Sequence, residues 1–187
     1  ALVPYPLGIS PAQRYRIEQW APHLERRGIH VTFAPFASEA TRSVLFQSGR
    51  TIAKSALVLR DTLLQATRSL SPRRHDVVLV CREASLIGPA WYEYLASRQR
   101  PVVFDFDDAV WLPQEGSVNR RWSFLRAPGK AASICRLASS VVAGNAHLAE
   151  YGRRHNARVA LVPSTVDLGS YGAPKTHSAT AMPVVGW

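Results

Sequence analysis

Short apolar segments alternate with helical patterns along most of the chain, and this alternation limits the folds that the sequence can adopt. Strand-like apolar runs recur at 1–5, 29–35, 76–81, 101–105, 139–143 and 158–162. Helical patterns fill most of the gaps between them. Strands that alternate with helices predict a parallel sheet, because each parallel pair needs a crossover connection. We therefore expect an α/β, Rossmann-like domain with helices on both faces of the sheet.

Two helical regions have predictable limits. The first helix should begin near Ala12, after the turn at 8–11, and end near Arg27 because Gly28 follows. Its sheet-facing side is predicted from residues three and four positions apart: Ile17, Trp20, Ala21 and Leu24. The stretch 38–70 lacks a strand signal and should form one or two helices, with a break near Ser48 and Gly49.

The length of 187 residues and the hydrophobic content of 47% suit a single globular core. After Tyr171 the sequence becomes small and polar with two prolines, which is typical of a linker. The apolar residues 184–187 then indicate the first strand of another domain. We expect one domain over 1–171, a linker and first strand of a second domain over 172–187, and a longer parent polypeptide.

The net charge of +10 comes almost wholly from arginine, since only three of the 23 basic residues are lysines. Such a surface favours anionic partners, and peripheral contact with an anionic membrane is one of them. The basic residues are scattered in pairs and form no stripe, which argues against nucleic acid.

The two cysteines, Cys81 and Cys135, are isolated and lack metal-type spacing. No signal peptide and no membrane-spanning run is present in the sequence. We expect a reducing, cytoplasmic setting, with peripheral attachment at the inner membrane left open, and no metal site.

Ligands of open parallel sheets bind beyond the carboxyl ends of the strands, so the residues that follow each strand are the candidates. After the first strand, a glycine turn opens a helix, where free N–H groups and arginines would hold an anion or a hydroxyl-rich acceptor. The residues concerned are Gly8, Ser10, Arg14 and Arg16. A plain turn with solvated arginines is the alternative.

After the third strand, Arg82 and Glu83 form either a simple ion pair or a ligand contact.

The strongest feature is the acidic cluster after the fourth strand, where Asp105, Asp107 and Asp108 stand within four residues. Adjacent carboxylates repel one another, and this arrangement suggests a metal, a cation or a proton-transfer task. Helix capping or pairing with arginines is the structural alternative. Trp111 after this cluster and Asn145 after the fifth strand, placed as a helix N-cap, complete the candidate acceptor site.

Several segments together resemble family 4 glycosyltransferases. They are the helix end at 27–31, the helix start from Asn145 to Tyr151, the strand and turn at 159–167 with its Pro-x-x-Val-Asp pattern, and the final Val-Val-Gly-Trp. The resemblance implies a GT-B enzyme in which this N-terminal half binds a saccharide, lipid-linked or cell-envelope acceptor. It also implies that a second domain holds the nucleotide-sugar donor, with no other cofactor, and that the transfer retains configuration.

The resemblance locates the reacting sugar opposite the end of the fourth strand, where many relatives carry a histidine. Here Asp107 and Asp108 stand in its place, so both are candidate catalytic residues, with Asp107 polarising or orienting the acceptor hydroxyl. The donor-binding Glu-x7-Glu motif does not occur in the sequence, and we therefore expect this chain alone to be inactive.

Three other interpretations remain. The segment 103–110 also resembles the first motif of haloacid-dehalogenase-type phosphatases, in which Asp105 would be the nucleophile and Asp107 the acid/base. Those enzymes need a later acidic pair, and only Asp167 follows among the aspartates. The Asp-x-Asp of 105–107 is also found in metal-dependent GT-A transferases. A non-catalytic Rossmann-type binding module is the third alternative.

Overall fold

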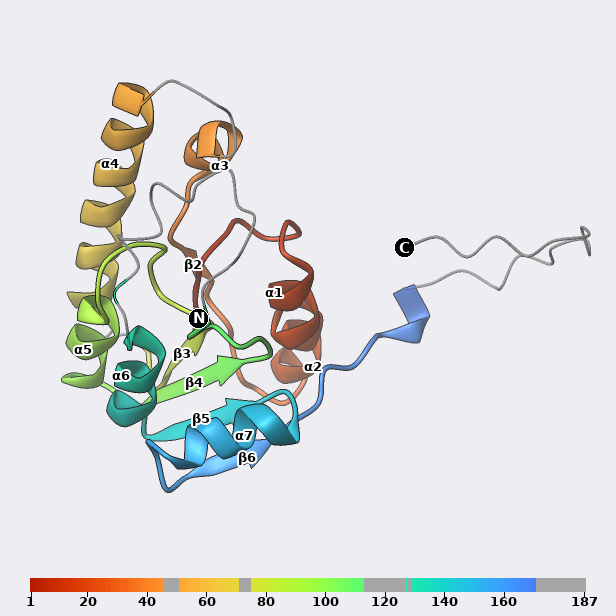
Figure 1. The fold of residues 1–187 in the computed structure, drawn as a ribbon. Helices are drawn as coiled ribbons and strands as arrows, with labels where there is room; N and C mark the ends of the chain where they lie inside the picture. The colour runs from red at the N-terminus through yellow and green to blue at the C-terminus, as the bar shows by residue number, and fades with distance from the viewer. Residues whose placement is uncertain (46–50, 71–74, 113–126, 128, 171–187) are drawn as a thin grey trace, which may run out of the picture.

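Six parallel strands form one sheet in the computed structural model, which describes residues 1–45, 51–70, 75–112, 127 and 129–170. The strand order is β2-β1-β3-β4-β5-β6 (Figure 1). The strands are β1 (Leu2–Val3), β2 (Ala34–Pro35), β3 (Val78–Cys81), β4 (Val102–Phe106), β5 (Ser140–Ala143) and β6 (Val159–Leu161). Each lies in or overlaps one of the six predicted runs, so the predicted parallel α/β sheet is confirmed.

Helices lie between the strands, and one 3-10 helix follows the last strand. They are α1 (Pro11–Arg16), the 3-10 helix η1 (Glu18–Trp20), α2 (Ala21–Glu25), α3 (Glu39–Leu45), α4 (Thr51–Leu70), α5 (Trp91–Ser97), α6 (Lys130–Leu137), α7 (Ala146–Arg153) and the 3-10 helix η4 (Leu168–Ser170). The region 38–70 contains two helices, which is one of the two outcomes expected. The predicted break near Ser48 and Gly49 and the predicted linker after Tyr171 lie outside the described residues.

The first helical region differs from the prediction of one continuous helix. Ile17 has φ −139° and interrupts the helix, so the chain forms α1, η1 and α2 in succession. Ile17 is buried as expected, but Trp20 is 41% exposed, and the prediction that it faces the sheet is wrong. The interruption changes the direction in which later side chains point, which a periodicity argument does not capture. Gly28 adopts φ +76° just after this region, in keeping with its predicted role as a helix stop.

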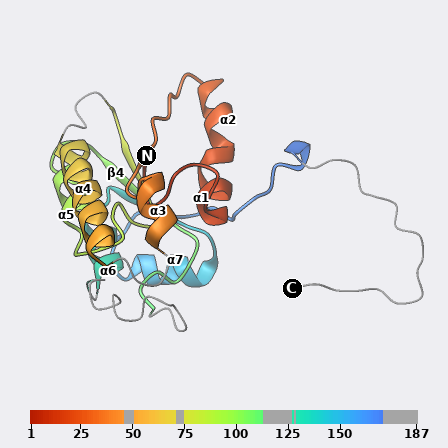
Figure 2. The same cartoon turned by 90° about the horizontal axis from the view of Figure 1, so that it is seen from above.

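Helices cover both faces of the sheet. On one face, Phe104, Phe106 and Val80 pack with Ile134 of α6 and Leu148 of α7 in the main core. On the other face, Val3 and Cys81 pack with Ile17 and Leu24. Figures 1 and 2 show α4 and α5 on the side of the molecule opposite α1 and α2. No helix among the described residues is both long and apolar enough to cross a bilayer.

The strand order reverses direction between β1 and β3, because the connection from β2 to β3 crosses back over β1. In doubly wound sheets the ligand crevice lies outside the carboxyl ends of the strands at such a switch point. The register aligns Cys81 with Asp105 and Phe106 with Ala143, so the segments that follow β3, β4 and β5 start side by side at this edge.

Candidate functional site

A buried ion pair joins the first helix to the central strand. The Arg16 guanidinium, at the end of α1, contacts both carboxylate oxygens of Asp105 in β4, and Nε lies 3.1 Å from Oδ2. The two side chains are only 3% and 7% exposed. Arg16 also donates to the carbonyl of Val162, just after β6. Burial raises the pKa of Asp105, and the Arg16 guanidinium opposes that shift. Both residues thus hold the sheet edge together, and their predicted contact with an acceptor remains a prediction.

Asp107 has a different environment. It follows β4 directly and is half-buried, and its Oδ1 is buried without a hydrogen-bond partner among the described residues. Burial raises the pKa of Asp107, and the charge of Asp108 adds to the shift, while Arg82 and Arg16 oppose it. A carboxylate with an unused buried oxygen and a raised pKa is suited to accept a proton from a bound group.

Gly144, after β5, lies close against the backbone of Asp107. A Cβ atom added to Gly144 would lie 3.1 Å from the Asp107 Cα. The N–H of Gly144 also donates to the carbonyl of Phe106 at 3.0 Å. The sequence reasoning did not identify Gly144, and its only signal was a glycine directly after a strand at the ligand edge.

Asp108 is exposed and forms an ion pair with the partly buried Arg82, with 3.0 Å between its Oδ2 and Nη1 of the arginine. This agrees with the alternative in which the acidic cluster pairs with arginines. Arg82 has φ 65°, and it is the only non-glycine residue with positive φ among the described residues. Such a backbone costs about 1–3 kcal/mol and is concentrated at functional sites. Arg14, a candidate residue of the turn after the first strand, lies over the ring of Tyr15, at 5.2 Å from its centroid.

Buried polar side chains hold the loop after β3. Glu93 of α5 accepts the N–H of Ala84 at 2.8 Å, and Gln65 of α4 donates to the carbonyl of the same residue at 2.7 Å. Lys130 donates to the carbonyl of Ser85 at 2.6 Å and lies 3.4 Å from Glu83. Arg82 thus pairs with Asp108 and Glu83 lies beside Lys130, and the predicted ligand contacts of Arg82 and Glu83 remain predictions.

Glu93 and Gln65 were missed because nothing in a single sequence marks a polar residue of a helix as buried. Both are fully buried, and Glu93 keeps one carboxylate oxygen without a partner among the described residues. Burial raises the pKa of Glu93, and Lys130 opposes the shift.

The loop after β1 is held by hydrogen bonds to Glu18 of η1. Gly8 adopts φ +78° and donates its N–H to Glu18 at 2.9 Å. Gln13 donates to the other Glu18 oxygen at 2.7 Å and to the carbonyl of Tyr5 at 3.0 Å. The Gly8 N–H is therefore not free, because it donates to Glu18. The predicted contacts of Gly8 and Ser10 with an acceptor remain predictions. Ser10 is buried at the N-cap of α1 and makes no side-chain capping bond.

Aromatic stacking fixes the segment after the acidic cluster. Trp111 stacks on Tyr151 of α7, with ring centroids 3.6 Å apart and planes 4° from parallel. Phe106 meets both rings edge-on. The predicted N-cap role of Asn145 is confirmed, since its side chain accepts the N–H of Leu148 at 2.9 Å. The predicted contacts of Trp111 and Asn145 with an acceptor remain predictions.

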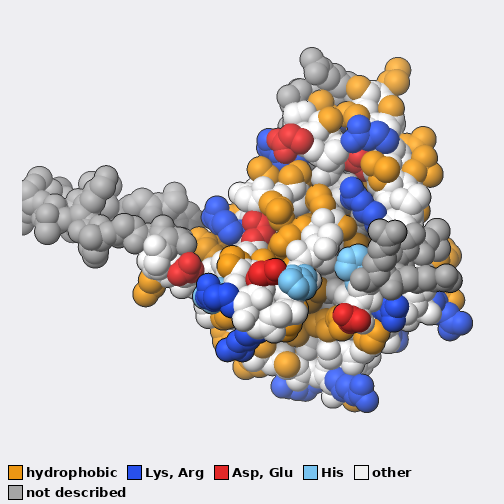
Figure 3. All heavy atoms as spheres, turned by 180° about the vertical axis from the view of Figure 1, so that it is seen from behind, with side chains coloured by type: hydrophobic (Ala, Val, Ile, Leu, Met, Phe, Trp, Pro, Cys, Tyr) orange, Lys and Arg blue, Asp and Glu red, His pale blue; other side chains and the backbone are white. Residues whose placement is uncertain are grey.

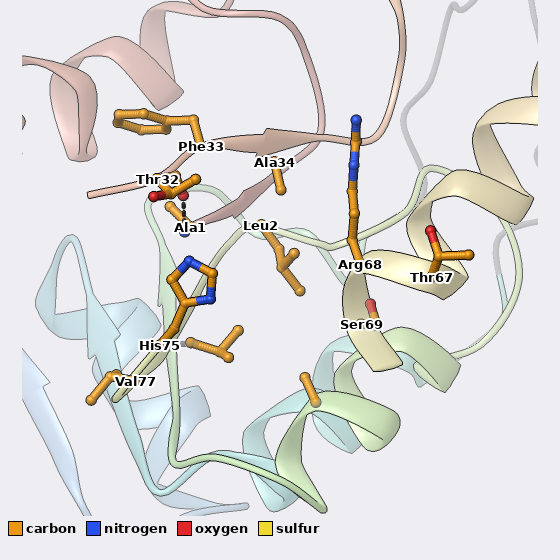
Figure 4. A pocket seen from close by; sticks show the side chains of 12 residues that line it. Ala1, Leu2, Thr32, Phe33, Ala34, Thr67, Arg68, Ser69, His75 and Val77 are labelled. Carbon is orange, nitrogen blue, oxygen red and sulfur yellow. Dashed lines mark hydrogen bonds between the residues drawn. The ribbon is translucent and has the colours of Figure 1, made fainter. Parts of the chain in front are cut away.

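A cavity of about 580 Å³ lies at the opposite edge of the sheet (Figure 4). Its lining includes Leu2, Ala34 and Val78, at or beside the starts of the first three strands, and the His75 side chain. The cavity is thus remote from the acidic cluster, and the rule for parallel sheets favours the carboxyl edge as the ligand site.

No group of three or more histidine, cysteine or acidic side chains in the described ranges is arranged to hold a metal ion. Cys81 and Cys135 are buried free thiols. Burial raises the pKa of both, that of Cys135 to about 11, so neither is a reactive thiolate near neutral pH.

Comparisons with known proteins do not identify a family. No family model, curated protein or solved structure matches this chain. The architecture therefore rests on the observed sheet, and a functional assignment rests on the geometry around Asp107.

Proposed function

We propose that this chain is the acceptor-binding half of a two-domain GT-B glycosyltransferase, with Asp107 acting on the acceptor hydroxyl. The proposal rests on which of the three carboxylates in the acidic cluster already have a partner. Asp105 pairs with Arg16, and Asp108 pairs with Arg82. Asp107, in contrast, has a buried oxygen without a hydrogen-bond partner among the described residues. It lies at the carboxyl edge, where parallel sheets bind their ligands.

The chemistry required is the activation of a sugar hydroxyl. The acceptor oxygen forms the new bond to the anomeric carbon of the donor, the bond from that carbon to the nucleotide diphosphate breaks, and the hydroxyl proton is transferred to a base. A carboxylate whose pKa is raised by burial is a stronger base than an exposed one, and Asp107 meets that requirement. The donor would be held by a second domain, as the family resemblance implies.

The acceptor is expected to be a saccharide, lipid-linked or not. Arg82 and Glu83, both partly exposed directly after β3, provide donors and acceptors at the carboxyl edge. A phosphatase mechanism is less compatible with this geometry, because its nucleophile would be Asp105 and both oxygens of that carboxylate already contact Arg16.

Ligand titration of the 187-residue chain tests the proposal. Amide chemical shifts in two-dimensional NMR should respond to saccharide acceptors at the segments after β1, β3 and β4. Nucleotide sugars should bind weakly, in the millimolar range or above, when measured by calorimetry. Micromolar binding of a nucleotide sugar, or acceptor-induced shifts confined to the opposite edge of the sheet, would refute the proposed half-enzyme.

A further inference from the structure

Helix α4 has its apolar residues on the outside. Four residues at steps of four, three and four positions form one face of the helix, which we name the outer stripe: Ile52, Ala56, Leu59 and Leu63. Ile52 is 87% exposed, Leu59 60% and Leu63 61%. In both Figure 1 and Figure 2 this helix lies at the outer edge of the molecule, and Figure 3 shows hydrophobic side chains along the corresponding upper right edge.

The inward face of α4 is polar. Lys54, Asp61, Gln65 and Ser69 are all buried. Asp61 accepts the N–H of Ser38, at the start of α3, at 2.8 Å, and Gln65 binds the loop after β3. Neither core cluster of the described residues contains a residue of α4. Among the described residues, the fully buried side chains of this helix are thus polar, and several large apolar ones are exposed, which inverts the usual pattern of a surface helix.

Exposed apolar residues that are contiguous over several turns of a helix indicate an interaction surface, in contrast to scattered single residues. The charges around the outer stripe restrict the partner. The single acidic residue of α4, Asp61, is buried, whereas Arg60 and Arg68 are exposed. Nη2 of Arg60 lies 3.1 Å from Oδ1 of Asp61, and Arg68 donates to the carbonyl of Pro35, which leaves its charge without an acidic partner among the described residues. The helix therefore presents hydrophobic and cationic side chains together to its surroundings.

We propose that the outer stripe of α4 docks on the surface of an anionic lipid bilayer. Helices that lie in the membrane interface bury an apolar face among the acyl chains and place basic side chains at the anionic headgroups. A 20-residue helix extends about 30 Å, enough for a lengthwise contact. This inference stands independently of the proposed glycosyl transfer.

A second copy of the chain fits the same surface less well. Each chain carries a net charge of +10, so two copies repel each other, whereas an anionic bilayer attracts each one. The 20 residues of α4 also span fewer than the roughly three to four heptads that indicate a coiled coil.

Vesicle flotation tests the proposal with the 187-residue chain. We expect binding to phosphatidylcholine vesicles that contain phosphatidylglycerol, weaker binding to pure phosphatidylcholine, and weakening by added salt. The double variant Leu59→Gln/Leu63→Gln should lower the partition coefficient at least about tenfold. The matched control Ile29→Gln/Leu168→Gln changes two exposed apolar residues away from α4 and should leave binding unchanged.

A second readout does not depend on those glutamine variants. An environment-sensitive fluorophore on Leu63→Cys should shift its emission to the blue on anionic vesicles, while the same label on Ile29→Cys should not. The native thiols are buried, so the label should react at the new cysteine. The absence of vesicle binding, equal binding by the double variant, or a lipid-free dimer in sedimentation that the double variant abolishes would overturn the proposal. The last result would assign the stripe to a second copy.

Discussion

Adjacent carboxylates at the end of β4 have different surroundings, and this difference should separate their roles. Asp107 is half-buried with an unused oxygen, whereas Asp108 is 59% exposed and pairs with Arg82. Exchanging a carboxylate for an amide preserves shape and removes charge and basicity. In a protein that carries both proposed halves, we expect Asp107→Asn to lower turnover at least about tenfold, equivalent to about 1.4 kcal/mol of barrier. Steady-state kinetics with a melting curve would measure both effects, and normal turnover with a lower melting temperature would make Asp107 structural.

Asp108→Asn is the matched comparison. Ion pairs at the surface contribute no more than about 1 kcal/mol, because water screens them, and the Asp108 carboxylate of this pair is exposed. We therefore expect a loss of stability within that limit and a smaller loss of turnover than for Asp107→Asn. Equal kinetic losses for the two variants would mean that the cluster acts as one unit, and the division of roles argued above would be wrong.

Gly144 allows a close approach to Asp107 that a side chain at this position would crowd. Its added Cβ would lie 3.1 Å from the Asp107 Cα and 3.2 Å from its Cβ, so the backbone after β4 would have to move. We expect Gly144→Ala to destabilise the chain by about 1–3 kcal/mol in urea unfolding. Gly152→Ala in α7 is the control, since its nearest neighbours are side-chain atoms at 3.4 Å and alanine favours helix by about 1 kcal/mol. A Gly144→Ala variant as stable as the control would show that the contact is not restrictive.

At the scale of elements, the sequence predicted the strands well because their apolar runs are local. Contacts between distant residues were not predictable in the same way. Arg16 was expected near a ligand as a basic residue after the first strand, yet it pairs with Asp105, 89 residues away. The interruption at Ile17 and the polar inward face of α4 likewise depend on tertiary packing. Periodicity predicts that a helix has two faces, but the direction of each face depends on the neighbours available.

The loop after β3 should respond to pH through Glu93. Burial raises the pKa of this carboxyl above its ordinary value of 4.5, so the folded chain binds the proton more tightly than the unfolded chain does. The protonated Glu93 carboxyl therefore stabilises the folded state. This contribution to the free energy of unfolding is fully present at pH values below the ordinary pKa, and it is lost as the pH rises through the pKa of the folded state. Glu93→Gln removes this titration. The unfolding free energy of the native chain minus that of the variant should therefore fall as pH rises above 4.5. Urea unfolding at a series of pH values measures this difference, and a constant difference would show that Glu93 does not titrate on unfolding.

At the scale of the whole molecule, the Arg16 guanidinium links parts of the chain that are far apart in sequence. It belongs to α1, contacts Asp105 in β4 and donates to the carbonyl of Val162 after β6. Removing one partner of a buried ion pair leaves the other charge buried without compensation, which costs about 3–5 kcal/mol. We expect Arg16→Met to destabilise the chain by about that amount, measured as the free energy of unfolding in urea.

The double variant Arg16→Met/Asp105→Leu distinguishes the ion pair from simple packing. Apolar side chains often replace a buried pair without loss, because no uncompensated charge remains. We therefore expect the double variant to recover most of the stability that Arg16→Met loses, with a coupling energy well above the few tenths of a kcal/mol, ~0.3–0.5, typical of independent sites. Additive losses would mean that Arg16 acts through its bond to Val162 and its aliphatic contacts. Recovery would instead establish that the charge of Asp105 is tolerated in the sheet only because α1 supplies its counter-ion.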